Sequence, residues 1–386
     1  MSATVKKCFS ENFSTVPQFF FSPGRINLIG EHIDYNDGFV MPAAIDKGIY
    51  YAVAQNHSNE IHFYAVDFNE SFSVTIHDIK KNDGWRNYVL SVVNEFLILN
   101  KPVTGFDCVF AGDIPIGSGM SSSAAVEGGL AFAINEIFNC GLNKVELALL
   151  CQRAEHNFPG VKCGIMDMYA NLNGKKDHVL LLDCKNITHE YFPLQLTGYK
   201  IVLLNSKVHH SLASGEYNIR RQQCEEGLHI LKTELNIHSF RDIKQPEELT
   251  LHKNKMTSDV YNCCRYVVDE IARTKKAGAL LKVNDLAAFG KLMYETHEGL
   301  SKLYRVSCAE LDFLVAYAGA DKNVTGARLM GGGFGGCTIN IVKENAVNDF
   351  IDHAAVSYNK QFNILPEAYV VEIGDGTGRI HVQISN

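Results

Sequence analysis

The sequence of 386 residues has neither a long apolar run nor an excess of positive charge. No segment approaches the ~20 apolar residues of a membrane span, and residues 19–21 are the only apolar run near the beginning. We therefore expect neither a transmembrane helix nor a secretory signal. The net charge of −7 provides no global positive field for nucleic acid or for an anionic membrane. Any phosphate chemistry must depend on local donors and on metal ions.

The sequence also lacks the cysteine spacings of a zinc site or of a disulfide framework. Its eleven cysteines are odd in number and include no Cys-x-x-Cys, and many of them lie in apolar periodic stretches. Buried thiols in a reducing compartment explain this pattern better than disulfides do. We therefore predict a cytoplasmic protein.

Predicted strands and helices are mixed along the chain without strict alternation. β-Branched and aromatic runs predict strands at residues 49–54, 61–65, 72–76, 106–110, 179–183, 201–205, 338–342 and 368–373. Apolar residues at helical spacing predict helices at residues 85–99, 124–138, 144–157, 164–172, 217–235, 259–275, 285–300, 306–318 and 346–358. This mixture predicts an α+β fold. A chain of this length fits two domains that share a cleft, which we assign to residues 1–190 and 191–386.

A glycine- and serine-rich segment, residues 115–125, lies between a predicted strand and a predicted helix. Such a junction presents unpaired amides and the positive end of the helix dipole to an anion. Glycines at 117 and 119 let the backbone approach a phosphate group, and serines at 121–123 can cap the helix, donate to phosphate oxygens or bind magnesium. A capped helix after a glycine turn is the alternative. Because three serines followed by two alanines exceed what capping requires, we favour a phosphate loop.

Signatures of other nucleotide-binding classes are absent. The loop has no Lys-Ser/Thr ending, and the chain contains neither His-Arg-Asp nor Asp-Phe-Gly. Gly331, Gly333 and Gly336 do form a Gly-x-Gly-x-x-Gly, but a predicted strand follows where a dinucleotide fingerprint requires a helix. We interpret this segment as a backbone platform beside a ligand, or as a tight turn.

Residues 24–38 combine polar side chains with apolar anchors. They hold one arginine, three carboxylates, a histidine, two amides and a tyrosine, interleaved with isoleucine and leucine. Such anchored polar groups suit a polyhydroxylated ligand, since carboxylates accept hydroxyl protons and His32 and Asn36 can donate or accept. A buried ion-pair network is the alternative.

Two further carboxylates flank a Pro-Gly break. Glu155 lies near the end of one predicted helix, and Asp167 lies in the first turn of the next. Both side chains can face one cleft. Considered alone, this pair would be explained better as two surface carboxylates.

Taken together, these segments resemble the galactokinases, within the GHMP family of small-molecule kinases. Residues 24–36 resemble the galactokinase signature, residues 117–125 the serine-rich phosphate loop, and residues 331–336 the third glycine motif. Residues 163–167 and 211–226 are also similar to galactokinase segments. The family fold is a two-domain α+β structure with the active site in the cleft between the domains.

The resemblance implies transfer of a phosphoryl group from MgATP to the C1 hydroxyl of galactose. It implies that Arg25 and Asp167 face the reacting hydroxyl as the catalytic pair. Implied substrate contacts are Glu31, His32, Ile33, Asp34, Asp167 and Tyr217. Implied ATP-binding residues are Trp85, Gly117, Ser118, Gly119, Met120, Ser121, Ser122 and Ser123, and implied magnesium ligands are Ser123 and Glu155. No nucleic acid, membrane or obligate protein partner is implied.

Four positions depart from the family pattern. Ile33 stands where threonine is usual, Met168 and Tyr169 replace Gln-Phe, and Met120 replaces leucine. Isoleucine at this position also occurs in N-acetylgalactosamine kinases, so a sugar-1-kinase for N-acetylgalactosamine or arabinose is an alternative. A non-catalytic sugar and ATP sensor is a second alternative, but such relatives lose part of the serine-alanine loop, which is complete here.

Overall fold

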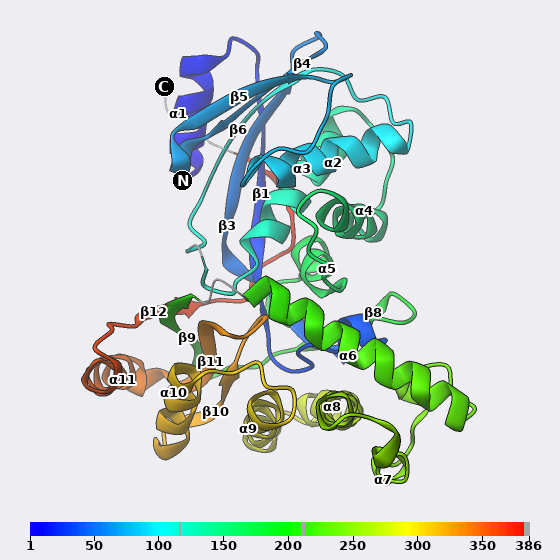
Figure 1. Cartoon of the computed structure of the whole chain (residues 1–386). Helices are drawn as coiled ribbons and strands as arrows, with labels where there is room; N and C mark the ends of the chain where they lie inside the picture. The colour runs from blue at the N-terminus through cyan, green and yellow to red at the C-terminus, as the bar shows by residue number, and fades with distance from the viewer. Residues whose placement is uncertain (116, 210–212, 382–386) are drawn as a thin grey trace.

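The computed structural model describes residues 1–115, 117–209 and 213–381. Two large sheets, one in each half of the molecule, are combined with helices that pack on them (Figure 1). This arrangement is the predicted α+β class. None of the described helices combines the length and hydropathy that crossing a bilayer would require.

The upper half in Figure 1 is built on a six-stranded sheet. Its strands, in spatial order, are β13 (Gly378–Ile380), β1 (Gln18–Asn27), β3 (Pro42–Gln55), β6 (Phe106–Gly112), β4 (Glu60–Ala65) and β5 (Glu70–Thr75). Neighbouring strands are antiparallel except for β6 and β4. The pairing of β1 with β3 shifts register between Pro23 and Arg25. A bulge of this kind re-aims a side chain, and here it immediately precedes the polar motif.

Helices cover the two faces of this sheet unequally. The bundle of α2 (Arg86–Ile98), α3 (Ser122–Ile137), α4 (Lys144–Asn157) and α5 (Met166–Asn173) packs on one face through α3 and α5. Gly129 of α3 permits close contact, because a Cβ there would lie 2.4 Å from the Tyr51 ring. On the other face, α1 (Ser2–Asn12) buries Val5 and Phe9 against β3 and β6. The strands β3 and β6 thus lie between α1 on one face and the α2–α5 bundle on the other.

The lower half contains a four-stranded antiparallel sheet in the order β10 (Val324–Leu329), β11 (Gly335–Lys343), β9 (Tyr199–His209) and β12 (Glu367–Val371). Two helices, α10 (Ala309–Ala320) and α11 (Val347–Phe362), share a separate apolar cluster with it. The helices α6 (Ala213–Glu234), α8 (Ser258–Lys282) and α9 (Leu286–Lys302) pack side by side, with the short α7 (Glu247–Thr250) near α8. In Figure 1, α6 runs across the boundary between the two halves.

A small three-stranded sheet lies next to α8. It is formed by β2 (Phe39–Val40), β7 (His178–Asp183) and β8 (Thr188–Pro193). Because β2 directly follows the polar motif, this sheet anchors the downstream end of that motif.

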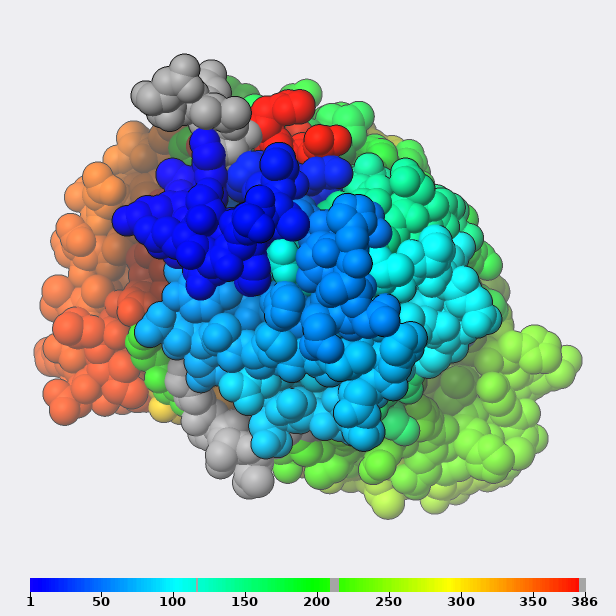
Figure 2. Space-filling view, turned by 90° about the horizontal axis from the view of Figure 1, so that it is seen from above, coloured from blue at the N-terminus to red at the C-terminus, as the bar shows by residue number. Residues whose placement is uncertain are grey.

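The two ends of the described chain meet in the upper half. Phe19–Phe21 of β1 pair with residues 378–380 of β13. The space-filling view shows the red segment beside the dark blue N-terminal helix (Figure 2).

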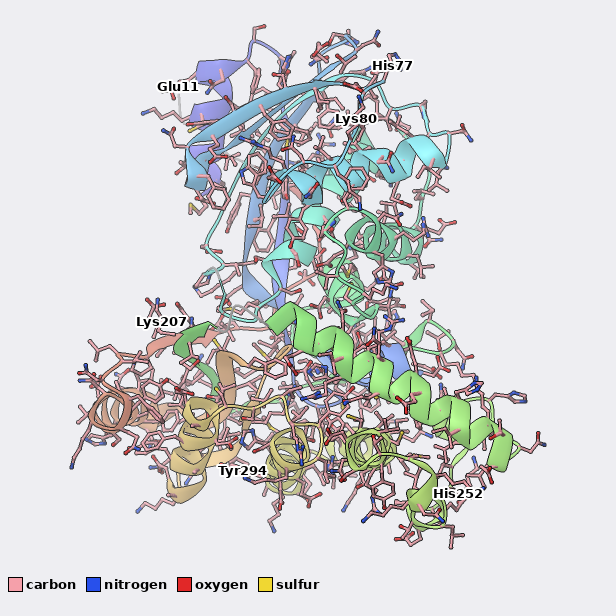
Figure 3. The ribbon with its side chains drawn as sticks, in the orientation of Figure 1. Glu11, His77, Lys80, Lys207, His252 and Tyr294 are labelled. Carbon is pink, nitrogen blue, oxygen red and sulfur yellow. The ribbon has the colours of Figure 1, made fainter. Side chains whose placement is uncertain are left out.

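Side chains such as Glu11, His77 and Lys80 lie at the periphery of the upper half (Figure 3). By contrast, Arg25, Glu31 and Arg328 are charged side chains that are buried, so each of them needs a partner inside the protein.

Candidate active site

The residues of the polar motif and of the phosphate loop border two cavities. The smaller cavity is lined by Arg25, Glu31, His32, Asp34, Cys163, Gly164, Met166, Asp167, Tyr217, Gly331 and Gly332. The larger one, of about 640 Å³, is lined by Trp85, Tyr88, Phe110 and other apolar groups together with Ser122 and Ser123. The structure thus brings together three of the motifs that the sequence singled out. The glycine- and serine-rich loop lines the larger cavity through Ser122 and Ser123. It is joined to the smaller cavity by the hydrogen bond from Arg25 to Gly119 O.

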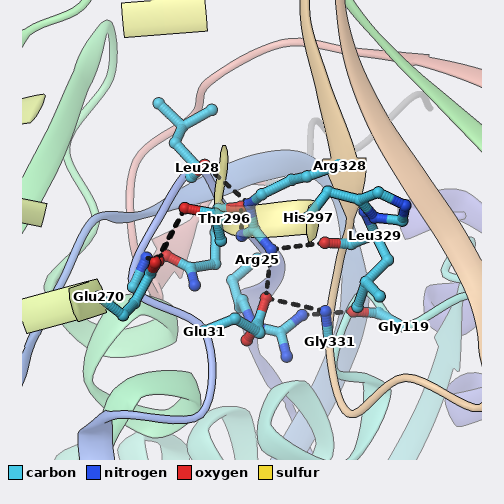
Figure 4. A network of polar contacts seen from close by, with 12 residues as sticks. Arg25, Leu28, Glu31, Gly119, Glu270, Thr296, His297, Arg328, Leu329 and Gly331 are labelled. Atoms are coloured by element: carbon cyan, nitrogen blue, oxygen red, sulfur yellow. Dashed lines mark hydrogen bonds and ion pairs between the residues drawn. The ribbon is translucent and has the colours of Figure 1, made fainter. Parts of the chain in front are cut away.

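Arg25 and Asp167 form a bidentate ion pair beside this loop. Nε and Nη2 of Arg25 donate to Oδ1 and Oδ2 of Asp167 at 2.9 and 2.8 Å. The Arg25 amide donates to Met120 O at 3.0 Å, and Nη1 donates to Gly119 O (Figure 4). A buried guanidinium with this many fixed acceptors has a defined geometry. The pair lies where the phosphate loop meets the smaller cavity.

Asp34 stands at the start of a 3₁₀ turn, Asp34–Asn36, on the wall of the smaller cavity. Its carboxylate packs so tightly on Gly164 that a Cβ there would lie 1.9 Å from Oδ2. Burial raises the pKa of Asp34 to about 7, and the negative charges of Asp167 and Glu31 add to this shift. Asp34 is therefore a carboxyl that changes charge near neutral pH.

His32 presents one ring nitrogen to the same cavity. Its Nδ1 lies 2.8 Å from the Tyr35 hydroxyl, while Nε2 is buried and has no partner within the described part of the chain. The rings of Tyr217 and Tyr304 lie 5.2 and 5.1 Å from the imidazole. Burial lowers the pKa of His32 to about 4, so the ring is neutral at physiological pH. A buried, unpaired nitrogen in a cavity suits a hydroxyl group of a ligand.

Glu31 connects the polar motif to the third glycine segment (Figure 4). Its Oε2 accepts from Arg328 Nη1 and from the Gly331 amide, both at 3.0 Å. Arg328 is fully buried and also donates to Leu28 O at 2.8 Å, to Leu329 O at 2.5 Å and to Asn27 O. One guanidinium therefore fixes the backbones of both segments.

A second buried carboxylate supports the same motif from α8. Glu270 accepts from the Gly30 amide at 2.9 Å and from the Thr296 hydroxyl at 3.0 Å, and it pairs with Arg273 (Figure 4). His297 lies beside this group, and its Nδ1 accepts from the Leu329 amide at 3.3 Å. The polar motif is thus held by residues that lie more than two hundred positions downstream.

Ser123 and Glu155 lie close enough to share a hydrogen bond. Glu155 is buried, and burial together with the negative charge of Asp167 raises its pKa to about 7. Among the described residues, no group of three or more His, Cys, Asp or Glu side chains is arranged to hold a metal. One carboxylate and one hydroxyl beside a phosphate site do fit Mg²⁺, which usually keeps several waters and takes phosphate oxygens as further ligands.

Trp85, at the start of α2, lies on the wall of the larger cavity. Its ring is nearly parallel to that of Phe68, with centroids 6.2 Å apart, and its Nε1 donates to Glu70 Oε2 at 3.0 Å. A large apolar cavity with aromatic walls suits a heterocyclic base.

The four positions that depart from the family pattern do not line the smaller cavity. Ile33 and Met168 are fully buried, and Tyr169 bonds to His189 Nδ1 at 2.8 Å. None of them is among the residues that line that cavity. The sugar contact predicted for Ile33 therefore gains no support from its position. Conversely, Arg328 and Glu270 were not singled out by the sequence, because neither lies in a recognisable motif.

Comparison with known proteins agrees with this geometry. The galactokinase galactose-binding signature matches residues 7–55, and the N-terminal and C-terminal GHMP kinase domains match residues 87–175 and 277–358. Galactokinases of Clostridium acetobutylicum and Clostridium beijerinckii are 41% and 39% identical, and each comparison covers 97% of both chains. The crystal structure of Lactococcus lactis galactokinase complexed with galactose is 32% identical and has a TM-score of 0.94, covering 98% of this chain and 99% of that chain. These matches confirm the ATP-dependent sugar kinase activity that the sequence predicted. The chain therefore belongs to the galactokinase family of GHMP kinases.

Proposed function

We propose that this chain transfers the γ-phosphoryl group of ATP to the C1 hydroxyl of α-D-galactose, giving galactose 1-phosphate and ADP. The observation that carries the proposal is the Arg25–Asp167 pair, which contacts the phosphate loop through Gly119 and also lines the smaller cavity. The galactose complex of the Lactococcus lactis relative supports galactose as the acceptor.

The smaller cavity is the proposed sugar site. Asp34 and Glu31 would accept protons from sugar hydroxyls, and the open Nε2 of His32 would bond to another. Tyr217 would close the site from α6, since its ring packs 5.2 Å from His32. The larger cavity would hold the adenine ring against Trp85. The phosphate groups would then lie on the amides of residues 117–123 at the N-terminus of α3.

Mg²⁺ would bind to Ser123 and Glu155, and its positive charge would neutralise the β- and γ-phosphate oxygens of ATP. The Glu155 carboxyl also accepts a hydrogen bond from Cys163 Sγ at 3.5 Å.

Catalysis would depend on alignment and charge neutralisation, because the transition state of phosphoryl transfer is loose. Asp167 would orient the C1 hydroxyl and accept its proton. Arg25 would fix that carboxylate and stabilise negative charge on the transferred group. In a loose transition state, we expect the proton to move after most of the bond to the leaving phosphate has broken.

A coupled ADP-release assay tests the proposal. We expect turnover with galactose to exceed turnover with N-acetylgalactosamine, arabinose and glucose. The absence of turnover with galactose would overturn it, and preferential turnover of N-acetylgalactosamine or arabinose would establish one of the other sugar-1-kinases.

Galactose affinity is expected to rise with pH through a midpoint near 7. The pKa of Asp34 is raised to about 7, so this carboxyl becomes a charged and stronger acceptor for sugar hydroxyls as the pH passes that value. If only the ionised form binds, affinity should increase about tenfold from about pH 6 to about pH 8. Isothermal titration with galactose measures this affinity directly. Nucleotide and magnesium are omitted, so that the protonation of Glu155, a proposed magnesium ligand, does not enter through metal binding.

Asp34→Asn is the control for that titration. The variant should bind galactose more weakly and show no rise with pH, and a rise that persists in the variant would exclude Asp34 as its source. Stability should change in the opposite sense. The unfolded chain releases this proton near 3.8 and the folded chain only near 7, so rising pH lowers the free energy of unfolding of the unliganded protein.

We propose that the reaction takes place in the cytoplasm and requires no protein partner. Eleven free cysteines, most of them buried, support a reducing compartment.

A further inference from the structure

Ser121 has a backbone conformation that its residue type disfavours. Its φ and ψ angles are 60° and 57°, in the left-handed region, whereas the nearby residues of the loop with positive φ are Gly117 and Gly119. Ser121 is the N-cap residue of α3, yet its side chain makes no capping hydrogen bond. Strain of this kind at a non-glycine residue persists only where surrounding contacts fix it.

The contact that the strained conformation permits is a hydrogen bond to the catalytic carboxylate. The Ser121 hydroxyl donates to Asp167 Oδ2 at 2.5 Å. By contrast, Ser122 and Ser123 line the larger cavity, and Ser121 is not among the residues that line either cavity of the active site. Ser121 therefore has different surroundings from the two serines that follow it.

Ser121 also completes a closed set of contacts around Asp167. Oδ2 accepts from Ser121 and from Arg25 Nη2, while Oδ1 accepts from Arg25 Nε alone. A carboxylate offers about four acceptor positions, so three are filled and Oδ1 retains the open one. Because Arg25 in turn bonds to Gly119 O and Met120 O, the carboxylate and the loop are joined on both sides.

From this arrangement we infer that Ser121 is a positioning residue for the transfer reaction and not a phosphate ligand. Its hydroxyl fixes the rotation of the Asp167 carboxylate, so that the open position on Oδ1 faces the sugar hydroxyl. It also ties that orientation to the loop that holds the nucleotide. The inference rests on the proposed function, since it assigns Ser121 a role through Asp167.

Ser121→Ala and Ser121→Gly, compared with Ser122→Ala and Ser122→Gly, test the inference. Both substitutions at 121 should lower kcat by about tenfold to hundredfold, as small misplacements of a reacting group do, and leave KM for ATP within about threefold. A phosphate ligand would give the reverse pattern, a raised KM for ATP with little change in kcat. That result would overturn the inference, as would wild-type kcat in both variants.

Thermal unfolding of the same four proteins provides a second readout. At position 121 the glycine variant should unfold at a higher temperature than the alanine variant, because glycine relieves the left-handed strain that alanine keeps. At position 122, the first residue of α3, alanine should be the more stable. An alanine variant at position 121 that is as stable as the glycine variant, or more stable, would show that the backbone of Ser121 is not strained.

A double-mutant cycle links the effect to Asp167. In the Asp167→Asn background, Ser121→Ala should cause no further loss of kcat, because the serine acts only through that carboxylate. An additive loss would refute this. Galactose turnover by the wild-type protein is measured first, so failure of the proposed function is distinguished from failure of this inference.

Discussion

Asp167→Asn is expected to lower kcat about 10³-fold while changing ATP affinity by no more than about threefold. Arg25 donates to both oxygens of Asp167, at 2.9 and 2.8 Å, and an asparagine can accept only one of these bonds. The NH₂ group of the asparagine would face either the guanidinium or the sugar hydroxyl. In neither orientation can the asparagine side chain accept the hydroxyl proton. Steady-state ADP release measures kcat, and titration with an ATP analogue measures the affinity.

Asp183→Asn is a matched control for this substitution. Asp183 also pairs with an arginine through both oxygens, with Arg241 at 2.5 and 3.0 Å, but it lines neither cavity of the active site. This variant therefore loses an equivalent ion pair without touching the site. Its kcat should remain within about twofold of the wild type. If Asp167→Asn kept a tenth or more of the wild-type kcat, Asp167 would be excluded as the proton acceptor.

Arg328→Met is expected to lower the free energy of unfolding by about 3–5 kcal/mol, the cost of leaving a buried charge without its partner. Arg328 is fully buried and pairs with Glu31 at 3.0 Å. It also donates to the carbonyl oxygens of Asn27, Leu28 and Leu329, and these groups would lose a donor. Urea denaturation, with the slope compared between variants, measures the change.

The double variant Arg328→Met with Glu31→Gln separates the ion pair from the packing. Removing the Glu31 charge as well should recover part of the stability, so the combined loss should be smaller than the sum of the single losses. A loss below about 1 kcal/mol for Arg328→Met alone would mean that solvent reaches Glu31 in the variant.

Elements with strong local signals were predicted well from the sequence. The helix predicted at residues 144–157 is α4 (Lys144–Asn157), whose start is set by a capping box between Asn143 and Glu146. By contrast, β1 was not predicted. Its aromatic run at residues 19–21 is short and is followed by Pro23 and Gly24, and the strand forms because β3 on one side and β13 on the other pair with it. Such pairing is a long-range interaction that leaves little local pattern.

The same distinction applies to the site. The roles of Arg25 and Asp167, of a phosphate loop and of a sugar-binding motif were predicted from local motifs and from a family resemblance, and the structure brings these segments together. The alternative interpretation of the sugar motif, a buried ion-pair network, is also part of the structure, but its partner lies elsewhere: Glu31 pairs with Arg328, 297 positions away. Sequence spacing carries no information on such a contact. Nor could it show that Ser121 bonds to the Asp167 carboxylate while Ser122 and Ser123 line the larger cavity.

The pairing of β13 with β1 has a consequence for folding during synthesis. The strand that carries Arg25 lies between β3 and residues 378–380, and Thr377 is buried there, bonding to Ser22 at 3.1 Å and to Asn171 Oδ1 at 2.8 Å. The upper sheet therefore reaches its complete hydrogen-bonded form only when almost 380 residues have left the ribosome. Until then β1 is an open edge at risk of intermolecular pairing. Ribosome-bound chains that stop before residue 377 should thus be markedly more sensitive to proteases around β1 than the released protein.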